Sequence, residues 1–353
     1  MKSLAFRLIA AAVAALSALA PISRLAAEED VRPVLTFARD FYRETSDVAF
    51  RKWLRESVYD KNDDSRYGLH LDKDWQQTAA KSPDLPLVLL IHGFNSTTAH
   101  NAPVIAPVHA AGFPYGSFSY PNDWSLAESA VLLSRQLKSF AKAHPNKKVA
   151  IVAHSMGGLV ARACLEDPEL DPGNVTRLVM VAPPSQGTFI AHTAVGADLW
   201  EHWIARSDGN GWTRWRDSVV DGLGEAADDL VPDSPFLKKL NARPRNPRVR
   251  YAIFLGTHSP VSAQEMGYLR LTLHTAGSRV EGLREYTDAV DTLVADMDEV
   301  VDGKGDGVVA IKRGRLEGVN DVVLLPFDHL SCTAEPEDAA VRSLQKEVLA
   351  RLR

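Results

Sequence analysis

Concentrated positive charge is missing from this sequence of 353 residues. It holds no long run of lysine and arginine, and 40 basic against 45 acidic side chains give a formal net charge of -5. A protein that binds nucleic acid needs a concentrated positive surface for the phosphates, so we expect no nucleic-acid partner. The composition is 45% hydrophobic and 24% charged, which is typical of a globular protein and excludes a disordered or fibrous chain.

Cysteine is scarce, with only Cys164 and Cys332 in the chain. No cysteine lies near the N-terminus, which argues against a lipoprotein anchor. Neither a Cys-x-x-Cys pair nor a His-Glu-x-x-His motif is present, so we expect no catalytic metal. An oxidising compartment would permit a disulfide between the two cysteines, but we favour two buried free thiols.

The N-terminal residues have the pattern of a secretory signal peptide. Lys2 and Arg7 give a positive start, the apolar run Leu8–Ala20 follows, and Ala27 closes a pair of small residues. We therefore expect a signal peptide over residues 1–27 and an exported protein, either periplasmic or secreted. An uncleaved membrane anchor is the alternative, although the apolar run is short for a spanning helix.

Residues 84–353 alternate short apolar runs with longer helical patterns. We expect strands over Leu85–Ile91, Tyr115–Tyr120, Lys148–Ala153, Arg177–Ala182, Val249–Leu255 and Asp321–Leu325. We expect helices over Trp124–His144, Met156–Glu166 and Pro336–Leu352. This alternation predicts an α/β domain with a mostly parallel sheet and helices on both faces.

Three regions lie outside this alternation: an N-terminal segment, 28–83, and two insertions, 185–247 and 258–304. The first insertion holds four of the seven tryptophans, Trp200, Trp203, Trp212 and Trp215. We expect it to form a cap over the carboxyl edge of the sheet and to allow transient contact with a membrane or lipid surface. The alternative is that the rings pack only the cap's own core.

The segment Ala153-His154-Ser155-Met156-Gly157-Gly158 joins an apolar strand to a helical pattern. A serine on a sharp strand-to-helix turn exposes its hydroxyl, and the turn needs small residues two positions before and after it. Ala153 and Gly157 meet this need. Ala153 replaces the first glycine of the G-x-S-x-G pattern and adds one methyl group. Ser155 is therefore the predicted nucleophile, and a chance serine in a small-residue turn is the alternative.

The segment His92-Gly93-Phe94-Asn95-Ser96 ends another predicted strand. Backbone amides at such a strand end can stabilise the oxyanion of a tetrahedral intermediate. We assign this oxyanion hole to the amides of Phe94 and Met156, with Gly93 allowing the close approach of the chain. His92 is interpreted as structural, fixing the loop by hydrogen bonding, rather than as a base.

A serine nucleophile needs a histidine to take its proton and a carboxylate to hold that histidine. His329 follows the last predicted strand and precedes the final helix, so it is the predicted base. His258 and His274 are the rivals, but neither follows a terminal strand. His144 and His154 are interpreted as serving a helix end and the packing of the elbow.

The segment Gly303-Lys304-Gly305-Asp306-Gly307 places a carboxylate ahead of the last strand and completes the chain order Ser, Asp, His. Asp306 is therefore the predicted acid, and Asp328 is expected to point away from the ring of His329. The rival acids crowd the same insertion: Asp288, Asp291, Asp296, Asp298 and Asp302. A calcium loop is not favoured, because Lys304 takes a ligand position and Arg313 stands where a bidentate glutamate is needed.

With these residues in order, the chain resembles a bacterial lipase or esterase of the α/β-hydrolase superfamily, near the GPI inositol-deacylase-like hydrolases. The motifs are HGFNS at His92, AHSMGG at Ala153, APPSQGT at Ala182, LVPDSPFLKKLN at Leu230, GDGVV at Gly305 and PFDHLS at Pro326. The resemblance implies hydrolysis of carboxylic esters, of lipids or other acyl groups, through an acyl-enzyme without a cofactor. It does not extend to residues 28–83 or to the insertion at His258.

Two other functions remain open on the sequence. An acyltransferase would use the same acyl-Ser155 intermediate but pass the acyl group to an alcohol instead of water. A lipid-binding protein on a catalytically silent hydrolase scaffold is the second, but an intact Ser, Asp and His in the right order argues against it.

Overall fold

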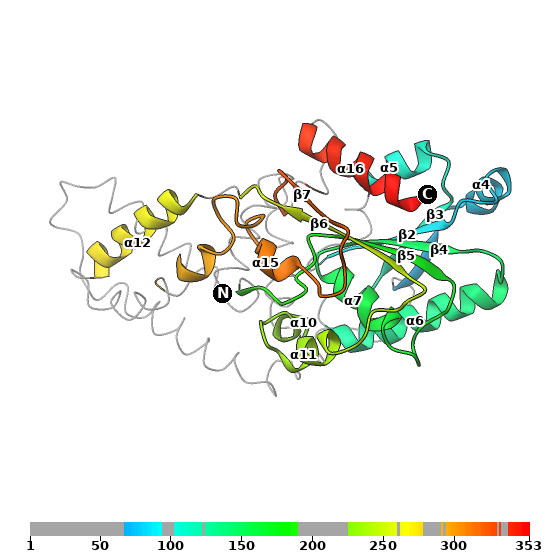
Figure 1. Ribbon diagram of the computed structural model, residues 1–353, viewed down its shortest axis with the longest axis horizontal. Coiled ribbons are helices and arrows are strands. Elements are labelled where there is room, and N and C mark those ends of the chain that lie inside the picture. The colour runs from blue at the N-terminus through cyan, green and yellow to red at the C-terminus, as the bar shows by residue number, and fades with distance from the viewer. Residues whose placement is uncertain are drawn as a thin grey trace, which may run out of the picture.

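A single seven-stranded sheet forms the centre of the fold, with the strand order β1-β3-β2-β4-β5-β6-β7 (Figure 1). The computed structural model describes residues 67–93, 102–121, 124–189, 225–259, 262–277, 291, 294–329, 332 and 338–353. The strands are β1 (Gly68–Leu71), β2 (Leu87–Ile91), β3 (Tyr115–Ser119), β4 (Val149–His154), β5 (Val175–Val181), β6 (Arg250–Gly256) and β7 (Val322–Leu325). Of these seven strands only the edge strand β1 pairs antiparallel, with β3, and this confirms the predicted mostly parallel sheet.

Helices cover both faces of this sheet (Figure 1). The helices of the described residues are α4 (Trp75–Lys81), α5 (Ala102–Ala110), α6 (Leu126–Ala143), α7 (Met156–Leu165), α10 (Glu225–Asp229), α11 (Pro235–Asn241), α12 (Ala263–Gly277), α15 (Ile311–Gly314) and α16 (Ala339–Leu352). One core cluster joins the sheet to α6, α7 and α11, and a second joins its other face to α5 and α16. The prediction of helices on both faces is therefore confirmed.

The core strands and the long helix α6 follow directly from their sequences. Every side chain of β2 is buried, as expected for a central strand of a parallel sheet with both faces covered. Helix α6 begins with a capping box, in which Ser125 and Glu128 satisfy the first backbone amides. Its residues Leu126, Ala130, Leu133 and Leu137 form the predicted apolar face and are fully buried. This face packs into the core cluster that also contains α7, the helix that follows the predicted nucleophile.

The N-terminal boundary of the sheet lies earlier than residue 84. Strand β1 adds an antiparallel edge, and helix α4 follows it with Trp75 packed against Phe140 of α6. Residues 67–83 are thus part of the same layered fold. The sequence does not predict β1, because the four residues Gly68–Leu71 are too few to show the alternation of apolar and polar side chains that marks a strand.

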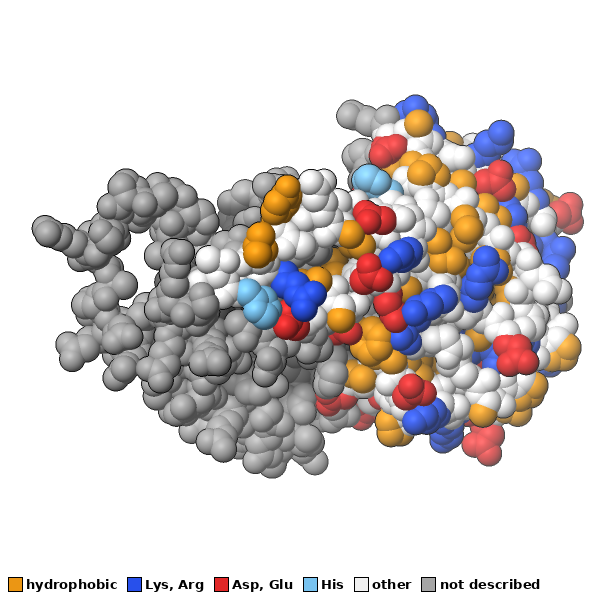
Figure 2. Space-filling model, turned by 60° about the vertical axis from the view of Figure 1, so that its left-hand side comes forward, with side chains coloured by type: hydrophobic (Ala, Val, Ile, Leu, Met, Phe, Trp, Pro, Cys, Tyr) orange, Lys and Arg blue, Asp and Glu red, His pale blue; other side chains and the backbone are white. Residues whose placement is uncertain are grey.

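A smaller core lies beside the sheet and joins the end of the predicted second insertion, 258–304, to the residues that follow it: Met297, Val300, Val301, Val308, Val309 and Ala310. Helix α12 extends from this region away from the sheet (Figure 1) and carries the exposed side chains Tyr268 and Leu271. Figure 2 shows acidic and basic side chains interspersed over the sheet domain. Among the residues that the structure describes, no helix combines the length and the apolar character needed to cross a membrane.

The predicted signal peptide, 1–27, and the four cap tryptophans, Trp200, Trp203, Trp212 and Trp215, lie outside the described residues. The signal peptide and the role of these tryptophans in a cap therefore stay predictions.

Candidate active site

Ser155 occupies a sharp turn between β4 and α7. Its backbone has φ 51° and ψ -127°, a conformation that non-glycine residues rarely adopt and that a functional site can hold under strain. A Cβ on Gly157 would lie 2.4 Å from the carbonyl oxygen of His92, and one on Gly93 would lie 3.0 Å from the Cβ of Ser155. The predicted strand, turn and helix are confirmed, together with the need for a small residue at position 157.

The structure brings Ser155, His329 and Asp306 together. His329 Nε2 lies 2.9 Å from Ser155 Oγ, and His329 Nδ1 lies 2.8 Å from Asp306 Oδ2. All three side chains are buried. An ionised carboxylate only accepts hydrogen bonds, so His329 Nδ1–H donates to it, and Nε2 of the neutral ring is left to accept the hydroxyl hydrogen of Ser155. This arrangement can remove a proton from the Ser155 hydroxyl.

A tight loop holds the carboxylate of Asp306. The backbone amides of Val308 and Val309 donate to Asp306 Oδ1 at 3.0 and 2.7 Å, which leaves Oδ2 for His329. The loop is held from outside by Thr188, whose hydroxyl donates to the carbonyl oxygen of Val308 at 2.6 Å. Thr188 belongs to the sequence motif after β5, so a segment far away in the chain fixes the loop of the predicted acid.

The loops of Asp306 and His329 meet above the end of β6. The amide of His329 donates to the backbone carbonyl of Asp306 at 3.0 Å. Gly256, the last residue of β6, leaves the room for this meeting. A Cβ there would lie 2.3 Å from the carbonyl oxygen of Phe327 and 2.6 Å from Asp306 Cβ. Gly256 is thus a site residue that the sequence did not reveal, since its role depends on two loops that approach it from elsewhere.

Two of the rival acids that the structure describes, Asp291 and Asp298, have other partners. Asp291 accepts hydrogen bonds from Arg270 and His274 at 2.7 and 2.8 Å, and the bond from His274 lowers the pKa of Asp291. Asp298 pairs with Lys304 at 2.8 Å. The rival base His274 is thereby paired with Asp291 instead of with Ser155. Asp288 lies outside the described residues.

Of the two predicted oxyanion donors, the structure describes only Met156. Met156 is the first residue of α7, where the amide has no acceptor within the helix, and it directly follows Ser155. Phe94 lies outside the described residues. The preceding His92 has the predicted structural role: its Nδ1 donates to the carbonyl of Gly93 at 2.9 Å, and its ring stacks on Tyr120 at 4.4 Å.

The two histidines that the sequence assigns to packing, His144 and His154, have these roles in the structure, and His154 makes a further contact. His144 ends α6 and packs against Trp75 and Phe140, as predicted for a helix end. His154 lies at the elbow as predicted, where a Cβ on Gly93 would be 3.0 Å from its Nδ1, and it also donates from Nε2 to the backbone carbonyl of His329 at 3.1 Å. The sequence could not reveal this bond, because the two residues are far apart in the chain.

Both cysteines are free and buried, which confirms the interpretation as thiols. Burial raises the pKa of Cys164 to about 12 and that of Cys332 well above its ordinary value. The sulfur of Cys332 donates to the carbonyl oxygen of His329 at 3.1 Å. This thiol therefore contacts the backbone of the predicted base.

Comparison with known proteins places the fold. A family model described as "Domain of unknown function (DUF7379)" matches residues 52–207, and no curated protein matches the sequence. The lipase BlEst2 of Bacillus licheniformis in its mature form is 17% identical, with a TM-score of 0.50 over 76% of this chain and 93% of that one. Its propeptide form gives the same identity and TM-score over 74% of this chain and 50% of that one.

Lipase 1 of Pelosinus fermentans is 13% identical, with a TM-score of 0.47 over 75% of this chain and 98% of that one. Because the Bacillus licheniformis lipase is only 17% identical to this chain, the likeness shows the fold alone. The chain has the α/β-hydrolase fold.

Proposed function

We propose that this protein is a serine hydrolase that cleaves carboxylic esters, with Ser155 as the nucleophile, His329 as the base and Asp306 as the acid. The observation that carries the proposal is the buried chain of hydrogen bonds, 2.9 Å from Ser155 to His329 and 2.8 Å from His329 to Asp306. A strained serine between a strand and a helix, with its carboxylate and histidine downstream in the chain, is the arrangement by which the α/β-hydrolase fold carries out acyl transfer.

In the acylation step, Ser155 Oγ attacks the carbonyl carbon of the ester while its proton moves to His329 Nε2. Asp306 accepts the hydrogen bond from Nδ1 and stabilises the imidazolium that forms. The tetrahedral intermediate collapses when the bond to the alcohol oxygen breaks, and His329 returns the proton to that oxygen. The products are the free alcohol and an acyl-Ser155 ester.

In the deacylation step, water replaces the alcohol. His329 Nε2 takes a proton from the water as its oxygen attacks the acyl carbonyl, and the proton then passes to Ser155 Oγ as the acyl bond breaks. The carboxylic acid leaves and the enzyme is restored. In both steps the amides of Met156 and Phe94 would donate to the oxyanion, which is the proposed role of the helix start beside Ser155.

We propose lipid or other acyl esters as the substrate class. The support is the likeness in fold to the lipase BlEst2, together with the predicted tryptophan-rich cap over the carboxyl edge of the sheet, where ligands bind in open α/β folds. The same proposal includes transient contact with a lipid surface through the cap, and export directed by residues 1–27.

The experiment is a panel of p-nitrophenyl esters of increasing chain length, measured on the wild type and on Ser155→Ala. Loss of one member of a triad lowers kcat by about 10⁴- to 10⁶-fold, so Ser155→Ala should retain almost no turnover above background. Thr176→Ala serves as the control, since this hydroxyl lies at the opposite end of the sheet and should leave the rate unchanged. Equal turnover in Ser155→Ala would overturn the proposal. Transfer of most of the acyl group to added glycerol instead of to water would identify an acyltransferase.

A further inference from the structure

We propose that His154, the residue immediately before the nucleophile, is a positioning residue that holds the base His329 by its backbone carbonyl. The inference rests on the proposed function, because it matters only if His329 acts on Ser155. It assigns to His154 a role that its place in the serine motif does not reveal.

The contact is specific in its atoms. His154 Nε2 lies 3.1 Å from the carbonyl oxygen of His329, and since a carbonyl only accepts, Nε2 must carry the hydrogen. The two rings lie 4.9 Å apart between their centroids, at an angle of 48°. His154 thus touches the base through its main chain while its ring stays beside the ring of His329.

The main chain of His329 is held on both sides. Its amide donates to the carbonyl of Asp306 at 3.0 Å, and its carbonyl accepts from His154 and from Cys332, whose sulfur lies 3.1 Å away. The thiol is a weak donor, so the imidazole provides the stronger of the two bonds at this carbonyl. The backbone of the base is therefore fixed between the acid loop and the end of β4.

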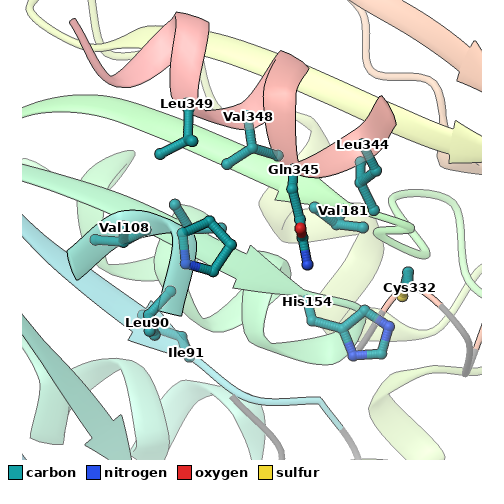
Figure 3. A pocket seen from close by; sticks show the side chains of 12 residues that line it. Leu90, Ile91, Val108, His154, Val181, Cys332, Leu344, Gln345, Val348 and Leu349 are labelled. Atoms are coloured by element: carbon teal, nitrogen blue, oxygen red, sulfur yellow. The ribbon is translucent and has the colours of Figure 1, made fainter. Parts of the chain in front are cut away.

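The surroundings make this bond consequential. His154 and Cys332 line the same pocket, which is otherwise mostly apolar and lies beneath α16, and Figure 3 shows them at one end of it beside Val181 and Leu344. A hydrogen bond among apolar side chains is stronger than one in water, so loss of the imidazole, which leaves this carbonyl only the weak thiol donor of Cys332, costs more here than it would at an exposed site. Removal of the imidazole should therefore let the loop of His329 shift.

The position of His154 directly before Ser155 in the chain explains how it can hold the base. His154 and Ser155 are consecutive, so the turn that orients the nucleophile also carries the donor that holds the base. Acylation of Ser155 removes the hydroxyl hydrogen bond to His329 Nε2, whereas the bond from His154 does not involve Oγ. His154 can therefore keep the ring in place while the acyl-enzyme awaits water.

The test compares His154→Leu, which keeps bulk but removes the donor, with His154→Gln, which keeps an N–H at a similar reach. A displacement of the base of about 1 Å lowers the rate by about 100-fold, so we expect His154→Leu to lose between about 10- and 100-fold in kcat with KM nearly unchanged. His154→Gln should recover most of the rate. Val348→Ala, which removes pocket packing without touching His329, is the matched control and should lower stability alone.

Labelling with a fluorophosphonate separates positioning from misfolding. The probe bonds its phosphorus to Ser155 Oγ, releases fluoride and passes the hydroxyl proton to His329, so its rate depends on the base while its end point counts folded sites. We expect His154→Leu to label more slowly than the wild type but to the same final extent. Equal labelling rates and equal kcat in the wild type, His154→Leu and His154→Gln would overturn the inference, and an inactive, unlabelled wild type would instead refute the proposed function.

Discussion

Replacing Gly256 by alanine should separate the loops of the acid and the base. The added Cβ would lie 2.3 Å from the carbonyl oxygen of Phe327 and 2.6 Å from Asp306 Cβ, whereas ordinary contact begins at 3.4 Å. The two loops would therefore have to retreat by about 1 Å in different directions. Because Phe327 lies two residues before His329, this retreat displaces both His329 and Asp306, the two partners of the hydrogen bond between the base and the acid.

Two effects of this substitution can be estimated. Overpacking of a well-filled core lowers the free energy of unfolding by about 1–3 kcal/mol. A displacement of about 1 Å between catalytic groups lowers the rate by about 100-fold. We therefore expect Gly256→Ala to remain folded with reduced stability and to lose on the order of 100-fold in kcat/KM, a loss larger than the drop in folded protein explains.

The assay combines denaturant unfolding with ester turnover per folded molecule. Gly267→Ala is the matched control, because a Cβ on Gly267 in α12 meets nothing within 4 Å. In a helix that change should raise stability by up to about 1 kcal/mol and leave turnover unaltered. Wild-type kcat/KM in folded Gly256→Ala would show that the two loops tolerate the methyl group and would refute this reasoning.

Three further predictions concern the acid, the thiols and the cap. Asp306→Asn should lower kcat by about 10⁴-fold through loss of the correct tautomer of His329. Asp298→Asn breaks only an exposed pair with Lys304 and should leave ester turnover intact. A larger loss of kcat in Asp298→Asn than in Asp306→Asn would assign the role of the acid to Asp298. Since burial raises the pKa of both Cys164 and Cys332, neither should be a thiolate or react with a thiol reagent near pH 8 in the folded protein, while both should react after unfolding; rapid labelling of native protein would contradict this burial. If the cap binds the acyl chain, burial of about 0.8 kcal/mol per methylene should raise kcat/KM by roughly fourfold for each added carbon. Alanine at Trp200, Trp203, Trp212 or Trp215 should reduce this increase. An unchanged dependence on chain length in folded variants would show that these rings only pack the core of the cap.

Local patterns in the sequence were sufficient for most of the sheet. The apolar runs predicted β2 to β7 with ends within two residues, because central parallel strands are buried on both faces and read as continuous apolar segments. The elbow was predictable for a similar reason, since small residues around Ser155 are a local requirement of the turn. Strand β1 was missed because it is short and lies at the edge, where packing demands less of its sequence.

The supporting residues of the site were not predictable in this way. Gly256 matters only because the loops of Asp306 and Phe327 converge on it, and Thr188 matters only because its hydroxyl reaches Val308. His154 was assigned to the elbow on its local motif, yet its partner is a carbonyl in the loop of the base. Each of these roles depends on contacts between distant segments, which a single sequence read locally does not contain.

The most direct measurement of the central claim is the position of a covalent fluorophosphonate adduct, found by digestion and mass spectrometry of the labelled protein. The account predicts one adduct per chain, on Ser155, and its absence from Ser155→Ala. An adduct on another residue, or labelling that persists in Ser155→Ala, would contradict the assignment of Ser155 as the nucleophile.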